Sequence, residues 1–202
     1  MDMTKQIRKS GDERRIEIAQ AILRIIGERG LAALTTAGVA EEVGVSAGAL
    51  FRHFASRDEM VSAAAELALQ MIDQTFPSSD LAPLDRVVGL ARNRAELLRS
   101  ELGIAWLLKS DQAHLVLLEG AAQKVQEMGT RSKNFLRQAI LEGREDGTIR
   151  TDVQPEVIMV TVMGTIHALT GISKIHSSTD SQSKLDPEII FSGLKRMLAT
   201  AG

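Results

Sequence analysis

Residues 35–57 read TTAGVAEEVGVSAGALFRHFASR, and this stretch decides the fold of the N-terminal part of the chain. Apolar residues at helical spacing predict one short helix before Gly44 and a second one after Ser46. Gly44 suits a tight turn with positive φ, because glycine has no Cβ atom to clash there. Ser46 stands where the second helix begins, and its hydroxyl can cap backbone N–H groups that have no partner within the helix.

The second helix of this pair is expected to pack on one side and face solvent on the other. Val45, Leu50 and Phe54 share the inner side with Val39 and Ala40 of the first helix. The outer side carries small and basic residues: Ala47, Gly48, Ala49, Arg52 and His53. Two short helices around a glycine turn, with the second one facing outward, are typical of a DNA-binding helix-turn-helix.

The pattern extends on both sides of this stretch. From Arg15 to Met60 the chain shows, in order, an apolar stripe from Ile16 to Ile26, then Glu28-Arg29-Gly30, Leu34-Thr35-Thr36, Val39-Ala40, Gly44-Val45-Ser46, Gly48, Leu50-Phe51, His53-Phe54 and Arg57. This series resembles the TetR family of bacterial repressors almost position by position. The resemblance implies an all-α fold of about nine helices, with a helix-turn-helix domain and flexible basic arm at residues 1–57. Residues 58–202 would then form a helical effector-binding and dimerisation domain.

Two positions depart from the family pattern. The family usually has tyrosine where this chain has Phe51, so a hydroxyl that would reach a DNA phosphate is missing. It usually has lysine where this chain has Arg57, which keeps the charge and adds a planar guanidinium.

Base readout is expected to depend on few side chains. The exposed face of the second helix offers mainly alanine and glycine, so Arg52 is the main candidate for guanine. By resemblance, Thr36, His53 and Arg57 would hold phosphates, and the arm at Arg8 and Lys9 would enter the adjacent minor groove. The alternatives are a helix cap for Thr36 and ordinary surface side chains for Arg52 and His53. The candidate DNA-binding residues are Arg8, Lys9, Thr36, Ser46, Ala47, Gly48, Ala49, Phe51, Arg52, His53 and Arg57.

The charge balance limits how strongly the chain can bind a polyanion. The formal net charge is −2, and residues 1–60 hold nine Lys or Arg against nine Asp or Glu. Residues 1–15 carry a surplus of two positive charges. We therefore expect a modest number of phosphate contacts per subunit, doubled by dimerisation, and an affinity that falls steeply with salt.

Composition excludes several other classes of protein. Hydrophobic residues make up 44% of the chain and aromatic residues 3%, which favours helices over sheets, and there is no cysteine to form disulfides. The first nine residues lack the apolar core of a signal peptide, so a cytoplasmic protein is expected. Catalytic, metal-binding and cofactor-binding motifs are missing, and an enzyme is not expected.

Capping and turn signals predict the remaining helices. Ser10 to Glu13 has capping-box spacing and would open a helix that runs to about Glu28, with Gly30 after its end. Ser56 to Glu59 repeats the spacing. Further helices are predicted at about residues 56–76, 83–99, near Trp106, 115–140, 155–175 and 187–198.

The apolar run from Val157 to Ile175 is long enough to suggest a membrane span. Interrupting threonines, His167 and the absence of a second span argue instead for a helix that is buried on more than one side. Its small residues would let another helix approach closely. By resemblance, this helix and the last one form a homodimer interface that includes Gly164, Ala168, Gly171, Ile190, Leu194 and Met197.

The C-terminal part is expected to hold an effector cavity. In the resembled family the cavity lies among the fourth, fifth, seventh and eighth helices, and such sites are mostly apolar. The candidate lining residues are Met71, Trp106, His114, Met128, Phe135, Met163 and His167. For each of them an ordinary core position is the alternative. Because these helices are expected to bring few charges inward, the predicted effector is lipophilic or aromatic and lightly charged.

Three functions remain open from the sequence. The first is a dimeric repressor that binds a near-palindromic operator in double-stranded DNA and is released by a small effector. The second is a regulator of the same fold whose pocket is closed and which acts without a small molecule. The third is a helical dimeric binding module that has lost DNA binding, as the neutral charge balance and Phe51 would allow.

Overall fold

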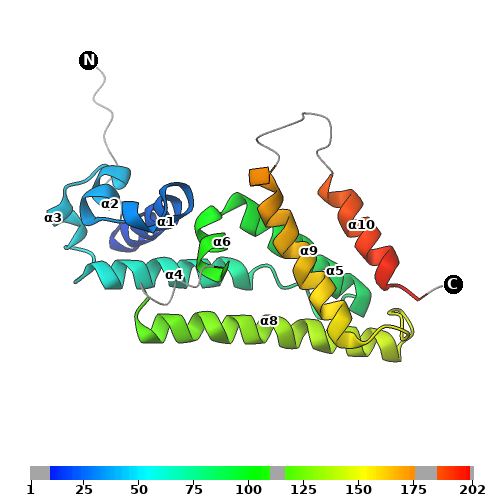
Figure 1. Ribbon diagram of the computed structural model, residues 1–202. Helices are drawn as coiled ribbons and strands as arrows, with labels where there is room; N and C mark the ends of the chain where they lie inside the picture. Colours follow the sequence, from blue (N-terminus) through cyan, green and yellow to red (C-terminus); the bar gives the residue numbers. More distant parts are fainter. Residues whose placement is uncertain (1–9, 110–116, 176–185, 201–202) are drawn as a thin grey trace, which may run out of the picture. The chain divides into compact units, whose positions relative to one another are not determined.

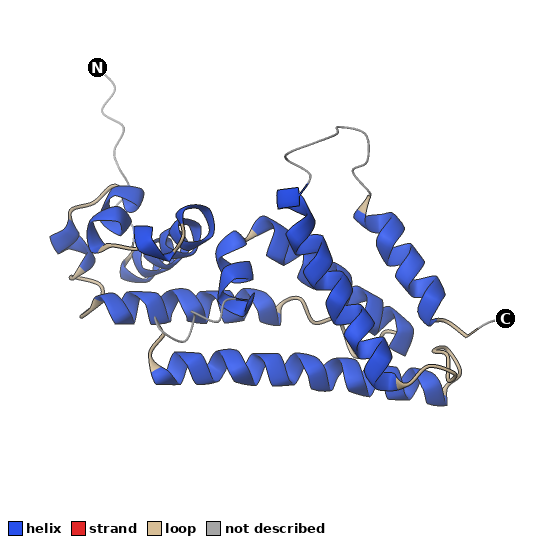
Figure 2. Ribbon diagram, viewed as in Figure 1, coloured by secondary structure: helices blue, strands red, loops and turns tan. Residues whose placement is uncertain are grey.

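The computed structural model describes residues 10–109, 117–175 and 186–200, and these residues are all-α (Figures 1 and 2). They form nine α-helices and one short 3-10 helix, with no strand beyond an isolated bridge between Ile149 and Ala199. The predicted all-α fold is therefore confirmed.

The chain divides into two compact units. Unit 1 comprises Met1–Ala68 and Glu101–Gln123, and unit 2 comprises Leu69–Ser100 and Lys124–Gly202. This division separates the parts of the chain that are compact by themselves. The predicted boundary after residue 57 instead separates a DNA-binding part from an effector-binding part, and it stays a prediction.

Unit 1 contains the helices of the N-terminal stretch and one returning helix. They are α1 (Gly11–Arg29), the 3-10 helix η1 (Leu31–Ala33), α2 (Thr36–Val43), α3 (Ala47–Leu50) and α6 (Leu102–Lys109), together with the first part of α4 (Arg57–Asp73). The core of this unit is aliphatic: Ile18, Ile22 and Ile25 of α1 are at most 1% exposed.

The helix starts follow the capping signals of the sequence. At α1 the Glu13 backbone N–H donates to the Ser10 hydroxyl (3.2 Å), and the Ser10 N–H donates to the Glu13 carboxylate (2.7 Å), which confirms the capping box. At α4 the Glu59 N–H donates to the Ser56 hydroxyl (3.1 Å). The Glu59 carboxylate accepts from the Ala55 N–H (2.6 Å), so the second half of this box is displaced by one residue.

Helices α1 and α6 cross with their backbones in contact at two glycines. A Cβ atom on Gly27 would lie 2.5 Å from the Gly103 nitrogen. A Cβ atom on Gly103 would lie 2.7 Å from the carbonyl carbon of Leu23 and closer still to its oxygen. Only hydrogen fits at these positions, so the two glycines permit the crossing.

Unit 2 is built on α5 (Pro83–Ser100), which packs against α9 (Pro155–Ile175) and α10 (Pro187–Leu198). Figure 2 shows α9 crossing over α5. The long helix α8 (Glu119–Glu145) contributes residues from Lys124 onward. Its predicted start near residue 115 lies outside the described residues. A turn follows this helix at Gly147, which has a φ of 78°.

Helix α4 ends at Asp73, three residues before the predicted end at Phe76. The Thr75 hydroxyl donates to the Ile72 carbonyl oxygen (2.6 Å), and the Thr75 N–H donates to the same oxygen. A side chain that hydrogen-bonds to a carbonyl group of the last turn competes with continuation of the helix. Pro77, two residues after Thr75, also disfavours a longer helix.

Within the part of the chain that the structure describes, no helix has both the length and the apolar character needed to span a membrane. This holds for α9, the helix that contains most of the apolar run.

Candidate nucleic-acid interface

The helix-turn-helix forms as the sequence predicts. Gly44 ends α2 with a φ of 73°, and the Val45 N–H donates back to the Ala40 carbonyl oxygen (2.9 Å). The Ser46 hydroxyl accepts from the Ala49 N–H (3.2 Å) and caps α3. The turn and the cap together direct α3 away from α2.

The inner sides of the two helices are closed by apolar residues. Val39 is 3% exposed, Ala40 5%, Leu50 0% and Phe54 1%, while Val45 is half-buried. The position of α3 is therefore held by burial on its inner side, and its outer side is left for solvent.

The outer side carries most of the predicted DNA-binding residues. Ser46, Ala47, Gly48, Phe51 and Arg52 are exposed. Ala49 and His53 are half-buried. The Arg52 side chain makes no hydrogen bond or ion pair with any described residue, so its guanidinium is available to an external acceptor.

Thr35, not Thr36, caps α2. The Thr35 hydroxyl accepts from the Gly38 N–H (3.0 Å). Thr36 is the first residue of the helix and is half-buried. A capping role for Thr36 is therefore wrong, and its contact with a phosphate stays a prediction.

Arg57 is tied to the loop before α2. Its Nε and Nη2 atoms donate to the Leu34 carbonyl oxygen at 3.3 and 3.0 Å. Arg57 is half-buried and is the first residue of α4. Its role in holding a phosphate also stays a prediction. Arg8 and Lys9 of the basic arm lie outside the described residues.

Arg15 is a positioning residue that sequence reasoning missed. Its Nη1 donates to the His53 carbonyl oxygen, its Nη2 donates to Glu59 (3.1 Å), and its guanidinium lies 4.0 Å from the centre of the Phe54 ring. The Ala55 N–H and then Arg15 lower the pKa of Glu59. One arginine of α1 thus joins the turn after α3 to the start of α4. No local pattern reveals this, because the partners are 38 and 44 residues away.

A second cross-link holds α2 against α1. Glu42 of α2 accepts hydrogen bonds from Arg24 (3.2 Å) and from Arg29 of α1. Three charged residues of unit 1, one acidic and two basic, are therefore engaged with one another and link α1 to α2.

The family profile described as "Bacterial regulatory proteins, tetR family" matches residues 18–64, which span the helix-turn-helix. The chain carries the N-terminal DNA-binding domain of the TetR family. The transcriptional repressor KstR2 of Mycobacterium tuberculosis is 25% identical over 153 residues, which are 73% of this chain and 74% of that protein. Proteins with this TetR-family domain are DNA-binding transcriptional regulators.

Solved structures show the same fold over almost the whole chain. The ketosteroid transcriptional regulator KstR2 of M. tuberculosis has a TM-score of 0.73 at 18% identity and covers 99% of this chain and 100% of its own. AibR, solved with isovaleryl coenzyme A and operator DNA, has a TM-score of 0.72 at 18% identity and covers 92% of this chain and 98% of its own.

The predicted effector residues of this TetR-family chain fall in both units. In unit 2, Met71, Met128, Phe135 and Met163 are half-buried and His167 is exposed. In unit 1, Trp106 is half-buried beside an apolar cavity of about 10 Å³. His114 lies outside the described residues. The assignment of these residues to an effector site stays a prediction.

Two arginines of α5 depart from the expectation that few charges turn inward. Arg86 and Arg94 are each 7% exposed. Arg86 pairs with Glu142, and this hydrogen bond, followed by one from Gln138, lowers the pKa of Glu142. Arg94 has no such partner among the described residues.

The predicted dimer residues differ from one another in how exposed they are. Gly164 and Ala168 of α9 are exposed, and Met197 of α10 is 61% exposed. Ile190 is half-buried, and Gly171 lies in α9. Leu194 is only 4% exposed, so it packs within its own protomer.

Proposed function

We propose that this chain is a homodimeric transcriptional repressor of the cytoplasm, which binds a near-palindromic operator and is released by a small lipophilic effector. The observation that carries the proposal is the outer face of α3. Helix α3 is capped by Ser46 and rests on a buried core. Its outer face presents small residues together with Arg52, which has no partner among the described residues. Small residues allow close approach of the backbone to the groove, and an arginine can bond to guanine.

The exposed apolar surface of α9 and α10 supports a dimer. Val157 and Val160 are 52% and 70% exposed, and Gly164 follows on the same face of α9. Ile189 of α10 is 60% exposed. Large exposed aliphatic residues grouped with small ones are typical of a surface that a second copy covers. A two-fold dimer would place two α3 helices in successive major grooves.

The comparisons support the repressor and effector parts of the proposal. KstR2 is named a transcriptional repressor. AibR carries an acyl thioester together with operator DNA. A lipophilic ligand also suits the half-buried methionines and Phe135 of unit 2, since methionine adapts to apolar ligands of varied shape.

The proposal is tested by DNA binding of the purified protein. We expect a sequence-dependent complex with DNA from upstream of its own gene, measured by fluorescence anisotropy, and an affinity that falls steeply between low and physiological salt. A scrambled duplex of the same composition is the control. Equal binding to both duplexes, or none to either, would remove the regulator function.

Arg52 and Arg57 are expected to contribute in different ways. Arg52→Ala should relax the preference at one base position, at a cost of about 1–3 kcal/mol for the preferred base. Arg57→Ala should weaken binding about equally on every sequence and reduce the salt slope by roughly one. Anisotropy with a set of single-base operator variants at several salt concentrations separates the two effects. The same loss of discrimination from both variants would contradict these roles.

A further inference from the structure

Among the described residues, Arg94 is a buried cation without an anionic partner. It lies on α5 in unit 2 and is 7% exposed. Arg86, eight residues earlier on the same helix and equally buried, bonds to the Glu142 carboxylate. Among the described residues, no carboxylate lies within ion-pair distance of Arg94. A buried charge normally has a paired counter-charge, because leaving water without one is costly.

The hydrogen bonds of Arg94 are strong on one side of the guanidinium only. Nε donates to the Thr75 hydroxyl at 2.8 Å. Nη1 reaches the Ser132 hydroxyl at 3.4 Å, and Nη2 reaches the Ile72 carbonyl oxygen at 3.5 Å. Both exceed the usual range of about 2.7–3.2 Å. The two terminal nitrogens, which together form the fork that matches a carboxylate, are therefore poorly bonded.

A purely structural role explains only part of this arrangement. Arg94 could serve as a cation at the C-terminal end of α4, but its bond to Ile72 is long and Asn93 already donates to the Thr75 carbonyl oxygen (3.2 Å). Asp73 is the carboxylate whose charge favours the ionised form of Arg94, yet Asp73 itself bonds to Arg131. Burial lowers the pKa of Arg94 to about 10, so the group is still charged at neutral pH.

An aromatic pair lies near this cation, in addition to its contacts with the Thr75 and Ser132 hydroxyls. The Phe76 ring lies 5.4 Å from the Arg94 guanidinium and packs edge-on against Phe135, with 5.2 Å between the ring centres. The Ser132 hydroxyl also donates to the Met128 backbone carbonyl oxygen one turn earlier on α8 (2.9 Å). A buried positive fork beside aromatic side chains matches a ligand with one negative end and an apolar body.

We propose that Arg94 is the anion anchor of the effector site, and that the effector is an amphipathic carboxylic acid. Its carboxylate accepts hydrogen bonds from Nη1 and Nη2, and its apolar body packs on Phe76 and Phe135. This inference rests on the proposed function only in assuming that ligand binding releases DNA.

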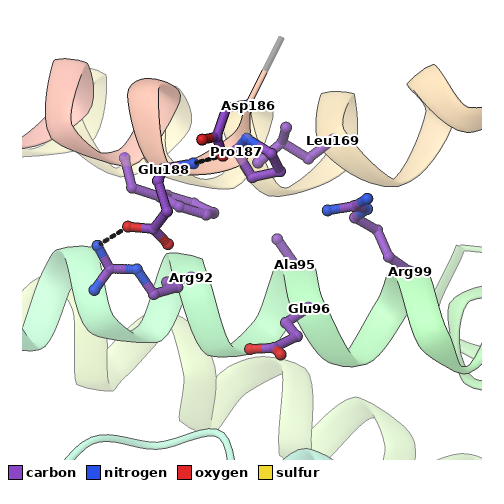
Figure 3. Close-up of a pocket in the computed structure, with 9 residues that line it drawn as sticks. Arg92, Ala95, Glu96, Arg99, Leu169, Asp186, Pro187 and Glu188 are labelled. Atoms are coloured by element: carbon purple, nitrogen blue, oxygen red, sulfur yellow. Dashed lines mark hydrogen bonds and ion pairs between the residues drawn. The ribbon is translucent and has the colours of Figure 1, made fainter. Parts of the chain in front are cut away.

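The open cavity of unit 2 shown in Figure 3 does not provide a comparable site. It measures about 230 Å³ and lies between α5, α9 and the start of α10. Arg92 already pairs with Glu188 there (2.9 Å), and the lining includes Glu96 and Asp186 as well. Three carboxylates against two arginines offer no net attraction to an anion. Arg92 is therefore a matched control for Arg94 on the same helix.

The test compares acids with neutral ligands of the same chain length. Isothermal titration of the DNA-free protein is carried out with the series from hexanoate to tetradecanoate and with the corresponding primary alcohols. For the chain length that binds best, we expect the acid to bind about tenfold to a hundredfold more tightly than the alcohol. Arg94→Met should abolish this ratio, Arg94→Lys should retain part of it, and Arg92→Met should leave it unchanged.

Several outcomes would overturn the proposal. They are equal binding of acid and alcohol, no binding by any acid of the series, and an unchanged ratio in Arg94→Met. A coenzyme A thioester such as decanoyl-CoA has phosphates but no free carboxylate. If its affinity depended on Arg94 and that of decanoate did not, the anion would be a phosphate and the carboxylate assignment would be wrong.

Two further measurements, thermal unfolding and operator binding, distinguish the ligand role of Arg94 from a folding defect and from a failure of the proposed function. The unliganded Arg94→Met variant should melt at or above the temperature of the parent, because an unpaired buried charge has been removed. A purely structural clamp predicts a lower melting temperature and an unchanged ratio of acid to alcohol affinity. If the parent protein fails to bind any operator, the proposed function fails, while the titrations still decide the role of Arg94.

Discussion

Gly103→Ala should unfold at a markedly lower urea concentration than the parent chain, with a loss of about 3 kcal/mol or more. The new methyl group would overlap the carbonyl group of Leu23 where α1 and α6 cross. The clash is with backbone, which cannot rotate away as the end of a flexible side chain can. The gain in helix propensity from alanine, about 1 kcal/mol, is too small to offset it.

Trp106 provides the measurement for this prediction. It lies on α6, three residues after Gly103, so its emission follows the packing of the same helix. Gly129→Ala in α8 is the matched control, because nothing lies within 4 Å of its new Cβ atom. That variant should be neutral or more stable by up to about 1 kcal/mol. Equal midpoints for Gly103→Ala and the parent would show that α1 and α6 are not held this closely.

Val160→Lys should separate the proposed dimer and reduce operator affinity by about a hundredfold to ten-thousandfold, because a linked pair of sites is lost. Val160 is 70% exposed in one protomer and lies on the face of α9 that carries Gly164. In a two-fold interface each protomer would bury the new ammonium group against the same surface of its partner. Burial of an unpaired charge is costly enough to break such an interface.

Analytical ultracentrifugation measures the oligomeric state in this experiment, and anisotropy measures the operator affinity. Leu81→Lys is the matched control, since Leu81 is 47% exposed before α5 and the change adds the same charge. That variant should remain dimeric and bind DNA at least as tightly as the parent. A Val160→Lys protein that stays dimeric would exclude this face of α9 as the interface.

The helix-turn-helix could be predicted because its determinants are local. Gly44 adopts positive φ, Ser46 bonds to the N–H three residues later, and Ser10 and Glu13 cap each other across one turn. Each interaction joins residues close in the chain, so the sequence pattern contains both partners. The exposed and buried sides of α3 followed from the same helical spacing.

The placement of Leu194 was harder to predict from the sequence. It was grouped with Met197 as a dimer residue, yet Leu194 is 4% exposed within one protomer and Met197 is 61% exposed. Both lie on α10, an amphipathic helix whose apolar residues exceed what one face needs. Hydrophobicity alone does not distinguish a residue that packs inside the protomer from one left for a partner.

The sequence by itself determined the family, the all-α class, the starts of most helices and the outward face of α3, because these depend on caps, turns and periodicity within a few residues. Only the tertiary structure decided that Arg15 braces the turn after α3, that Gly103 permits the crossing with α1, and that Arg94 is buried without a counter-charge among the described residues. Those features depend on residues far apart in the chain. Their partners are selected by packing, which a linear pattern does not record.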